Sequence, residues 1–195
     1  MEEIKLHTGA VASRRQQQIE DCLFENMLHM PYAAIRVADL CRQVGISRKA
    51  FYNYYHDKDA CLCAYIGRVI REAMLQITAE VPDNATPLET ATVLLEYWKR
   101  KKSFWDAIIR NQLLHYVMVQ SIQHIQAEDP VTMKLLSTAG MKSDLDILGC
   151  YMSVQMTLVL QWYFRDFQPG AEEMAKKLLR MTYQPFLAAE ADNLP

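Results

Sequence analysis

The segment from Val37 to Ser47 constrains the fold of this chain more than any other stretch. Its apolar residues recur with the i, i+3, i+4, i+7 spacing of a short amphipathic helix: Val37, Leu40, Cys41 and Val44. Gly45 follows where such a helix can end in a left-handed residue. Ser47 can then cap a second helix, because its hydroxyl accepts an amide proton of the first turn. A helix, a glycine turn and a capped helix predict a helix-turn-helix.

The second helix of this motif is expected to have two different faces. Phe51 and Tyr55 are four residues apart and should be buried together, and Ile46 has the spacing of a hydrophobic staple with Phe51. The opposite face carries cations and planar hydrogen-bonding groups near the helix start: Arg48, Lys49, Tyr52 and Asn53. Such a face suits DNA, because the second helix of the motif lies in the major groove with its N-terminal residues near base edges.

The start of the next helix carries a further indication of a phosphate contact. Asp57 can cap this helix, and Lys58 is then its first residue. A cation is disfavoured there, since the helix dipole already places positive charge at that end. An external phosphate at the helix start would explain the lysine.

Several of these residues fall into a known order. Val44, Gly45, Ile46 and Ser47 form the turn, Tyr52, Tyr54 and Tyr55 an aromatic cluster, and Lys58 with Asp59 a lysine–acid pair. In this order, residues 39–62 resemble the DNA-binding motif of TetR-family repressors. The resemblance implies that Tyr52, Tyr54 and Lys58 touch phosphates, while Ser47, Arg48 and Lys49 approach bases or backbone.

The chain departs from the family pattern at two places. Pro31 stands where the family usually has glycine, and Ile35-Arg36 stands where a capping threonine usually opens the second helix. No capping side chain is therefore expected at the start of this helix, and Arg36 can still reach a phosphate. The full set of expected DNA contacts is Arg36, Ser47, Arg48, Lys49, Tyr52, Asn53, Tyr54 and Lys58.

The distribution of charge fits a local basic surface. The chain has 195 residues and a formal net charge of -2, so the molecule as a whole is not a polycation. The segment from Arg42 to Lys58, however, contains four cations, Arg42, Arg48, Lys49 and Lys58, and a single acid, Asp57. A DNA-binding protein needs a basic face rather than a basic total, and the weak overall charge argues against nonspecific coating of nucleic acid.

The rest of the chain predicts an all-α fold of about nine helices, because no strand-like alternation of any length is present. We expect residues 1–12 to form a loose arm and residues 13–30 to form a helix that packs under the helix-turn-helix. Pro82 and Pro87 mark the clearest boundary, after which Thr86 and Glu89 form a capping box. We expect an N-terminal arm and DNA-binding domain over residues 1–56, a connecting helix over 57–80 and an effector-binding and dimerisation domain over 81–195. Further helices are expected over 87–101, 144–167 and 171–184.

The segment 144–167 is apolar on nearly every side, which a helix can sustain only when all its sides are buried. With the helix 171–184, it also resembles the dimerisation pair of the TetR family. We therefore expect a homodimer with an interface that includes Leu148, Tyr151, Leu158, Trp162, Leu178 and Met181. A dimer would present two recognition helices about 34 Å apart, so its operator should be a near-palindrome.

The segment 87–128 is rich in aromatic residues. Each one alone is more often part of a core than of a ligand site. As a group with a few polar side chains, they resemble the lining of a small-molecule pocket, and methionines suit a loosely shaped lipophilic ligand. The expected effector contacts are Trp98, Trp105, Gln112, His115, Tyr116, Met152 and Met156.

Other functions find no support in the sequence. No motif of a nucleophile elbow, Walker loop, zinc protease or dinucleotide site is present, so neither an enzyme nor a cofactor is expected. His115 and His124 are not on one helical face, which argues against a metal. The five cysteines favour structural burial, with redox sensing as the alternative. The most apolar stretch is too short and too interrupted by polar residues to span a bilayer, and the polar N-terminus is unlike a signal peptide, so a cytoplasmic protein is expected.

These patterns together predict a homodimeric, one-component transcriptional repressor that a small apolar effector releases from its operator. The effector can shift the protein only by its different affinity for two conformers, typically about 1–3 kcal/mol. The alternative is a DNA-binding protein whose C-terminal domain recruits a protein partner and binds no small ligand.

Overall fold

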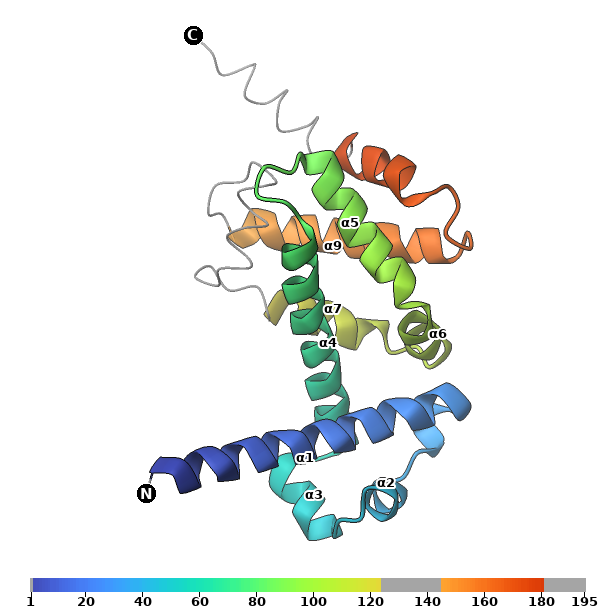
Figure 1. Ribbon diagram of the computed structural model, residues 1–195. Helices are drawn as coiled ribbons and strands as arrows, with labels where there is room; N and C mark the ends of the chain where they lie inside the picture. The colour runs from blue at the N-terminus through green and yellow to red at the C-terminus, as the bar shows by residue number, and fades with distance from the viewer. Residues whose placement is uncertain (1, 124–144, 181–195) are drawn as a thin grey trace. The chain divides into compact units, whose positions relative to one another are not determined.

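The computed structural model describes residues 2–123 and 145–180, and every regular element in these ranges is a helix (Figure 1). The predicted all-α class is confirmed. The chain forms two compact units. Unit 1 contains Met1–Val69 and Asp106–Gln120, and unit 2 contains Ile70–Trp105 and Ser121–Pro195. The sequence assigned residues 106–120 to the C-terminal domain, whereas in the structure they belong to the same unit as the helix-turn-helix.

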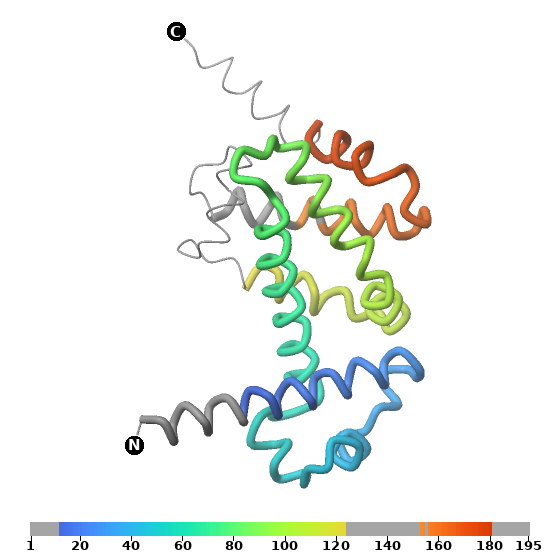
Figure 2. The backbone as a smooth tube through the Cα atoms, viewed as in Figure 1, coloured from blue at the N-terminus to red at the C-terminus, as the bar shows by residue number. Residues whose placement is uncertain are grey.

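Unit 1 begins with a long helix, α1 (Glu2–His29), and a short 3-10 helix, η1 (Tyr32–Ala34). Then follow α2 (Val37–Val44), α3 (Arg48–Tyr54) and the start of α4 (Lys58–Glu80), which the tube in Figure 2 traces from light blue to cyan. The predicted loose arm over residues 1–12 is wrong from residue 2 onward, because α1 begins at Glu2. This segment contains no proline and several good helix formers, so nothing in it stops the helix.

The core of unit 1 is built from apolar side chains that four helices contribute. Those with at most 3% of their surface exposed include Ile19, Leu23, Met27, Leu40, Cys41, Phe51, Cys61, Leu62 and Ile66. On α4, the predicted apolar stripe continues through Val69 and, within unit 2, through Ile70, Ala73 and Ile77, all buried. Because α3 contributes Phe51 to this core, its opposite side must face away from it.

The turn between α2 and α3 forms as its residue types predict. Gly45 ends α2 with φ 71° and ψ 41°, in the left-handed region. A Cβ atom there would meet nothing within 4 Å, so the backbone conformation, not space, favours glycine. The Ser47 hydroxyl accepts a hydrogen bond from the Ala50 amide at 3.1 Å and caps α3. The predicted helix-turn-helix geometry is confirmed at both residues.

Unit 2 contains the later part of α4, then α5 (Pro87–Arg100), the first part of α6 (Lys102–Arg110), α9 (Leu145–Tyr163) and a helical stretch over residues 171–180. The predicted capping box is present: Thr86 accepts from the Glu89 amide at 3.3 Å, and Glu89 accepts from the Thr86 amide at 2.7 Å. Helix α9 ends at Tyr163, four residues earlier than predicted, and Asp166 and Phe167 beyond its end have positive φ. The helix α7 (Leu114–Gln123) runs from unit 1 into unit 2. Within the described ranges, no helix combines the length and the apolar character that a membrane span requires.

Candidate nucleic-acid interface

The two predicted faces of α3 are present in the structure. Phe51 is fully buried and Tyr55 is 5% exposed, whereas Tyr52 is 47% exposed. The exposed face also carries Ser47, Arg48, Lys49 and Asn53. The Phe51 ring contacts the Tyr52 ring edge-on, with centroids 5.5 Å apart, so the buried ring supports the exposed one. Helix α3 therefore offers cations, a phenol and an amide on one accessible side.

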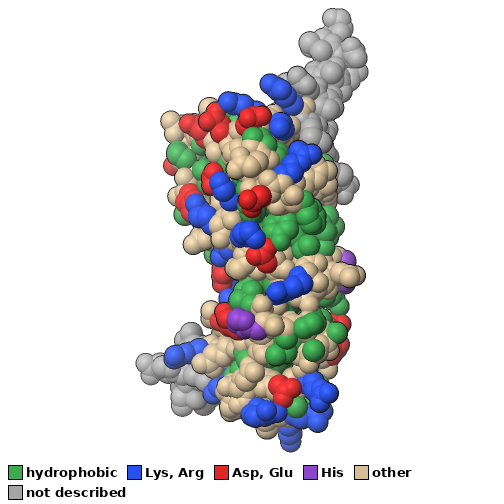
Figure 3. Space-filling model, turned by 90° about the vertical axis from the view of Figure 1, so that its right-hand side faces the viewer, with side chains coloured by type: hydrophobic (Ala, Val, Ile, Leu, Met, Phe, Trp, Pro, Cys, Tyr) green, Lys and Arg blue, Asp and Glu red, His purple; other side chains and the backbone are tan. Residues whose placement is uncertain are grey.

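Cations gather around this face. Arg36, Arg42, Arg48 and Lys49 are all exposed, and Arg42 pairs with an acid of its own helix, Asp39. That pair is largely exposed, so it neutralises little of the positive potential. Figure 3 shows Lys and Arg side chains gathered at the lower end of the molecule, at the height of α2 and α3 in Figure 1. A basic patch on one face is the electrostatic property that DNA binding requires.

Ile35 and Arg36, at the start of α2, do not supply the polar cap that a threonine would give. Arg36 is the N-cap residue of α2, yet its side chain makes no capping hydrogen bond. Ile35 is 4% exposed and belongs to the core. The start of α2 therefore has no side-chain cap, and the buried Ile35 side chain anchors the residue before it in the core. The Arg36 side chain is exposed and is free of a capping role.

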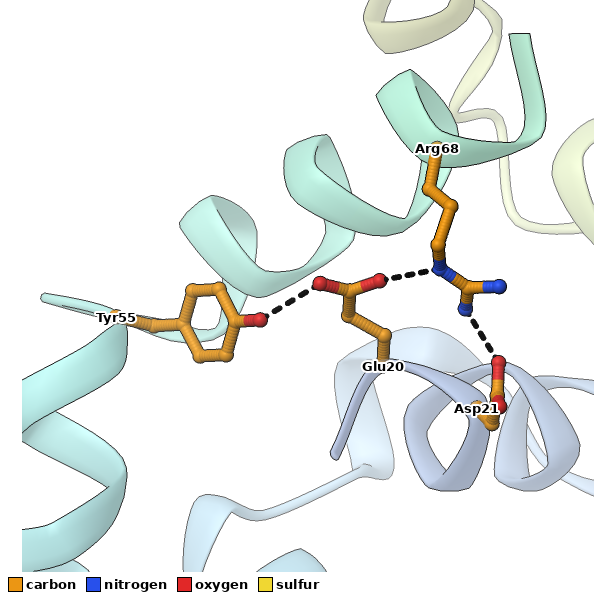
Figure 4. A network of polar contacts seen from close by, with 4 residues as sticks. All are labelled: Glu20, Asp21, Tyr55 and Arg68. Atoms are coloured by element: carbon orange, nitrogen blue, oxygen red, sulfur yellow. Dashed lines mark hydrogen bonds and ion pairs between the residues drawn. The ribbon is translucent and has the colours of Figure 1, made fainter. Parts of the chain in front are cut away.

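A buried polar network fixes the end of α3 (Figure 4). The Tyr55 hydroxyl, at the C-cap of α3, donates to Glu20 of α1 at 2.7 Å. Arg68 of α4 donates through Nε to the other Glu20 oxygen at 2.7 Å and through Nη2 to Asp21. Burial raises the pKa of Tyr55, and the hydrogen bond to Glu20 raises it further. Burial lowers the pKa of Arg68, but its bonds to the two carboxylates outweigh this effect. Three helices thus meet at a single carboxylate, a contact that the sequence analysis missed.

Lys58 has internal partners that explain its place at the start of α4. Its ammonium group donates to the carbonyl oxygens of Tyr32 at 2.6 Å and Ile35 at 2.9 Å, and it lies 4.0 Å from the centroid of the Tyr32 ring. Asp57 caps α4 as predicted, accepting from the Ala60 amide at 2.7 Å. Burial lowers the pKa of Lys58. The carbonyl groups around η1 are therefore a sufficient reason for a cation here, and the phosphate contact of Lys58 stays a prediction.

Replacing Lys58 with Met is expected to lower the stability of the protein in the absence of DNA by about 1–2 kcal/mol, because two carbonyls lose a charged donor. Urea unfolding of wild type and variant measures the effect. Arg48→Met is the matched control, since Arg48 is exposed and should change stability by less than about 0.5 kcal/mol. Equal stability of the Lys58 variant and wild type would mean that the hydrogen bonds to the two carbonyls do not stabilise the fold.

The join between α6 and α7 is hydrogen-bonded into unit 1. Arg110 donates to the carbonyls of Met27 and Leu28 at 2.8 and 3.0 Å, where α1 ends. Asn111 accepts from the Tyr32 amide at 2.7 Å. We refer to Arg110, Asn111 and Tyr116 as the 110–116 attachment. They hold residues 106–120 against the segment that precedes the helix-turn-helix.

Tyr116, the third residue of this attachment, is hydrogen-bonded to Asp59 of α4. The Tyr116 hydroxyl donates to one Asp59 oxygen at 2.9 Å, and the Tyr32 hydroxyl donates to the other. The hydrogen bond from Tyr32 lowers the pKa of Asp59, against the effect of burial. Asp59 was expected only as part of a lysine–acid pair. The structure gives it a function as the acceptor that joins η1 and α7 to α4.

The seven predicted effector contacts are divided between the two units. Trp98, Trp105 and Met156 are buried in unit 2, where the rings of Trp98 and Trp105 have centroids 5.3 Å apart and the Trp105 indole donates to the Trp98 carbonyl at 3.1 Å. In unit 1, Gln112 and His115 are exposed, and Tyr116 belongs to the 110–116 attachment. The Met152 side chain lies outside the described residues. The effector site stays a prediction.

The predicted dimer contacts that the structure describes are internal to one chain. Leu158, Trp162 and Leu178 are at most 7% exposed, and the Trp162 indole donates to the Pro169 carbonyl at 2.6 Å. The side chains of Leu148, Tyr151 and Met181 lie outside the described residues. A second chain that packed against α9 would meet Thr157 and Gln161, which are exposed. The homodimer stays a prediction, and these exposed residues are better placed to carry it than the three buried ones.

The described cysteines support structural burial. Cys22, Cys41, Cys61 and Cys63 are free thiols, and burial raises the pKa of each. A raised pKa keeps a thiol protonated, which makes it a poor nucleophile and a poor redox sensor. Across residues 2–123 and 145–180, no group of three or more His, Cys, Asp or Glu side chains could hold a metal ion.

Comparison with known proteins supports the prediction of a DNA-binding transcriptional regulator. No family model matches the chain. Over 61 residues, however, it is 44% identical to the HTH-type transcriptional regulator EthR of Mycobacterium tuberculosis, in two strains, and of Mycobacterium bovis. The match covers 30% of this chain and only 28% of those relatives. Over that segment, the chain is similar to DNA-binding transcriptional regulators of the helix-turn-helix type.

Proposed function

We propose that this protein is a homodimeric transcriptional repressor of the TetR type that binds a near-palindromic operator through α3. The observation that carries the proposal is the capped helix α3, buried through Phe51 and Tyr55 and exposed through Arg48, Lys49 and Tyr52. The similarity to helix-turn-helix regulators supports the same conclusion. Two copies of α3, about one DNA turn apart, read the two halves of the site.

The candidate DNA contacts have two kinds of role in this proposal. Arg36, Tyr52, Tyr54 and Lys58 bind phosphates, which fixes the position of the protein on the duplex without reading its sequence. Ser47, Arg48, Lys49 and Asn53 approach base edges near the start of α3. The Glu20–Arg68–Tyr55 network holds α3 at a constant angle, because its C-cap residue is bonded to α1 and α4.

A small apolar effector releases the operator in this proposal by favouring a second conformer. Helix α4 begins next to α3 and continues into unit 2, so a movement of α4 can transmit effector binding to the DNA-binding helix α3. The 110–116 attachment offers a second way for effector binding to affect the helix-turn-helix, because α6 also belongs to both units. The effector acts only to the extent that its affinity differs between the two conformers.

A second candidate function keeps the DNA-binding helices and replaces the effector with a protein partner. It is favoured by the side chain of Phe164, which is 70% exposed in unit 2. A thermal-shift screen with lipophilic compounds separates the two candidates. Specific stabilisation by a compound supports the effector, and unchanged melting curves with capture of a protein dependent on Phe164 support the partner.

Replacing Arg48 with Ala is expected to reduce discrimination at particular operator bases by about 1–3 kcal/mol, whereas Tyr52→Ala should weaken binding equally on all sequences. The reason is that base contacts carry sequence information and phosphate contacts do not. The operator is first found by footprinting DNA that flanks the coding region, or by selection from random DNA. Fluorescence anisotropy on operator and single-base variants, at several salt concentrations, then measures both substitutions.

Lys176→Ala is the matched control, because Lys176 is an exposed cation of unit 2. Its affinity for the operator should equal that of wild type. Operator discrimination that is unchanged in Arg48→Ala would exclude base reading by that residue. If neither Arg48→Ala nor Tyr52→Ala affected binding, DNA would not be bound through α3.

A further inference from the structure

Tyr32, the first residue of η1, is held by distant segments through its backbone, its ring and its hydroxyl. Its amide donates to Asn111 at 2.7 Å, and its carbonyl accepts from the Lys58 ammonium group at 2.6 Å. Its hydroxyl donates to Asp59, and the centroid of its ring lies 4.0 Å from the Lys58 nitrogen. Tyr32 therefore cannot move without breaking contacts to α4 and to the join between α6 and α7.

Lys58, a proposed phosphate contact, is fixed by this arrangement. An ammonium group has three N–H donors, and two of those of Lys58 are directed to the carbonyls of Tyr32 and Ile35. The third can be donated to a phosphate oxygen. Because two hydrogen bonds and a ring already hold the group, it loses little conformational freedom when it binds DNA.

The same segment fixes the backbone from which Arg36 extends. The Ile35 amide donates to the Tyr32 carbonyl at 3.1 Å, the Ile35 carbonyl accepts from Lys58 at 2.9 Å, and the Ile35 side chain is buried. Arg36 is the next residue, and its side chain is exposed. Two of the proposed phosphate contacts, Arg36 and Lys58, therefore depend on the position of Tyr32.

Two residues from outside the helix-turn-helix complete the support of Tyr32. Asn111 accepts from its amide, and the Tyr116 hydroxyl donates at 2.9 Å to the Asp59 oxygen that Tyr32 does not use. The bond between Tyr116 and Asp59 is exposed, so its contribution to the stability of the fold is small. A function in fixing the geometry of the DNA contacts explains it better than a function in the core.

We propose that Asn111 and Tyr116 are positioning residues for operator binding. They act through Tyr32 and Asp59 and hold Lys58 and Arg36 in place for the phosphates, without contacting DNA themselves. The inference rests on the proposed function, since it concerns the same DNA contacts. It makes the affinity for DNA depend on residues that lie far beyond the helix-turn-helix in the sequence.

The salt dependence of operator binding tests the variant Tyr116→Phe, which lacks only the hydroxyl. Fluorescence anisotropy gives the affinity of the full chain for the operator at several KCl concentrations. Each phosphate contact contributes about 0.9 to the slope of log affinity against log salt concentration. The slope of Tyr116→Phe should therefore be smaller than that of wild type by about 2 if each subunit of a dimer loses one contact.

Tyr97→Phe is the matched control for this measurement. It makes the same chemical change in unit 2, at a buried hydroxyl that has no hydrogen-bond partner among the described residues, and should keep the wild-type slope. In Arg36→Ala, Lys58→Met, which already lacks both cations, Tyr116→Phe should not change the slope further, because its effect acts through them. Urea unfolding verifies that each variant is folded.

The outcomes separate this inference from the proposed function. If wild type bound no operator, the proposed function would fail and the inference with it. If wild type bound its operator and Tyr116→Phe retained the full slope, the inference alone would fail. It would also be overturned by an equally reduced slope in Tyr97→Phe, or by an effect of Tyr116→Phe that persisted without the two cations.

Discussion

Replacing Arg68 with Met should lower the free energy of unfolding by about 3 kcal/mol, at the lower end of the range for breaking a buried ion pair. Glu20 is only 6% exposed and accepts from Arg68 at 2.7 Å. Without the guanidinium, its carboxylate retains one donor, the Tyr55 hydroxyl, in surroundings that water reaches poorly. We expect a stability loss at the lower end of that range because the Arg68 side chain is still 20% exposed.

Urea unfolding followed by circular dichroism measures this loss. The double variant Glu20→Gln, Arg68→Met should regain most of the stability, because removing both charges leaves no unpaired ion. Arg14→Met is the control, since Arg14 is exposed on the same unit. If the double variant were less stable than Arg68→Met, the unpaired charge would not be the cause of the loss.

Phe51→Ala should cost about 3–5 kcal/mol of stability and abolish DNA binding, because its ring is fully buried and holds α3 on the core of unit 1. Phe51→Leu keeps most of the buried volume and should cost less than about 1.5 kcal/mol if the site can repack, so it remains measurable if the alanine variant does not fold. Unfolding curves and anisotropy with operator DNA give both quantities.

Tyr52→Ala tests the residue that follows Phe51 and lies on the exposed side of α3. Tyr52 is 47% exposed, so its removal should change stability little while it weakens DNA binding. The two adjacent aromatic residues thus separate support of the helix from contact with DNA. Wild-type stability in Phe51→Ala, or a large stability loss in Tyr52→Ala, would mean that the two faces of α3 are assigned the wrong way round.

The features that could be predicted from the sequence are those that depend on neighbouring residues. Gly45 and Ser47 shape the turn before α3, and Thr86 with Glu89 caps α5, because in each case the interacting groups lie within a few residues. The two faces of α3 follow in the same way from the helical period. Local chemistry was sufficient for these features.

Features that depend on distant segments could not be predicted. Glu20 is 48 residues from Arg68 and 35 from Tyr55, and no local pattern links them. Lys58 was interpreted through the helix dipole, whereas its carbonyl partners come from residues 23 and 26 positions earlier. The apolar character of Trp162 indicated burial correctly, but it could not indicate whether the same chain or a second chain covers the ring.

The 110–116 attachment has a consequence for the design of chimaeras in which the helix-turn-helix of this protein is exchanged with that of another. A fragment that ended within α4 would keep the whole helix-turn-helix but lose Arg110, Asn111 and Tyr116. The carbonyls of Met27 and Leu28, the Tyr32 amide and one oxygen of Asp59 would then lose their partners. The helix-turn-helix is therefore not a segment that can be transplanted by its N-terminal sequence alone. A chimaera that exchanges it has to carry residues 106–120 from the same parent.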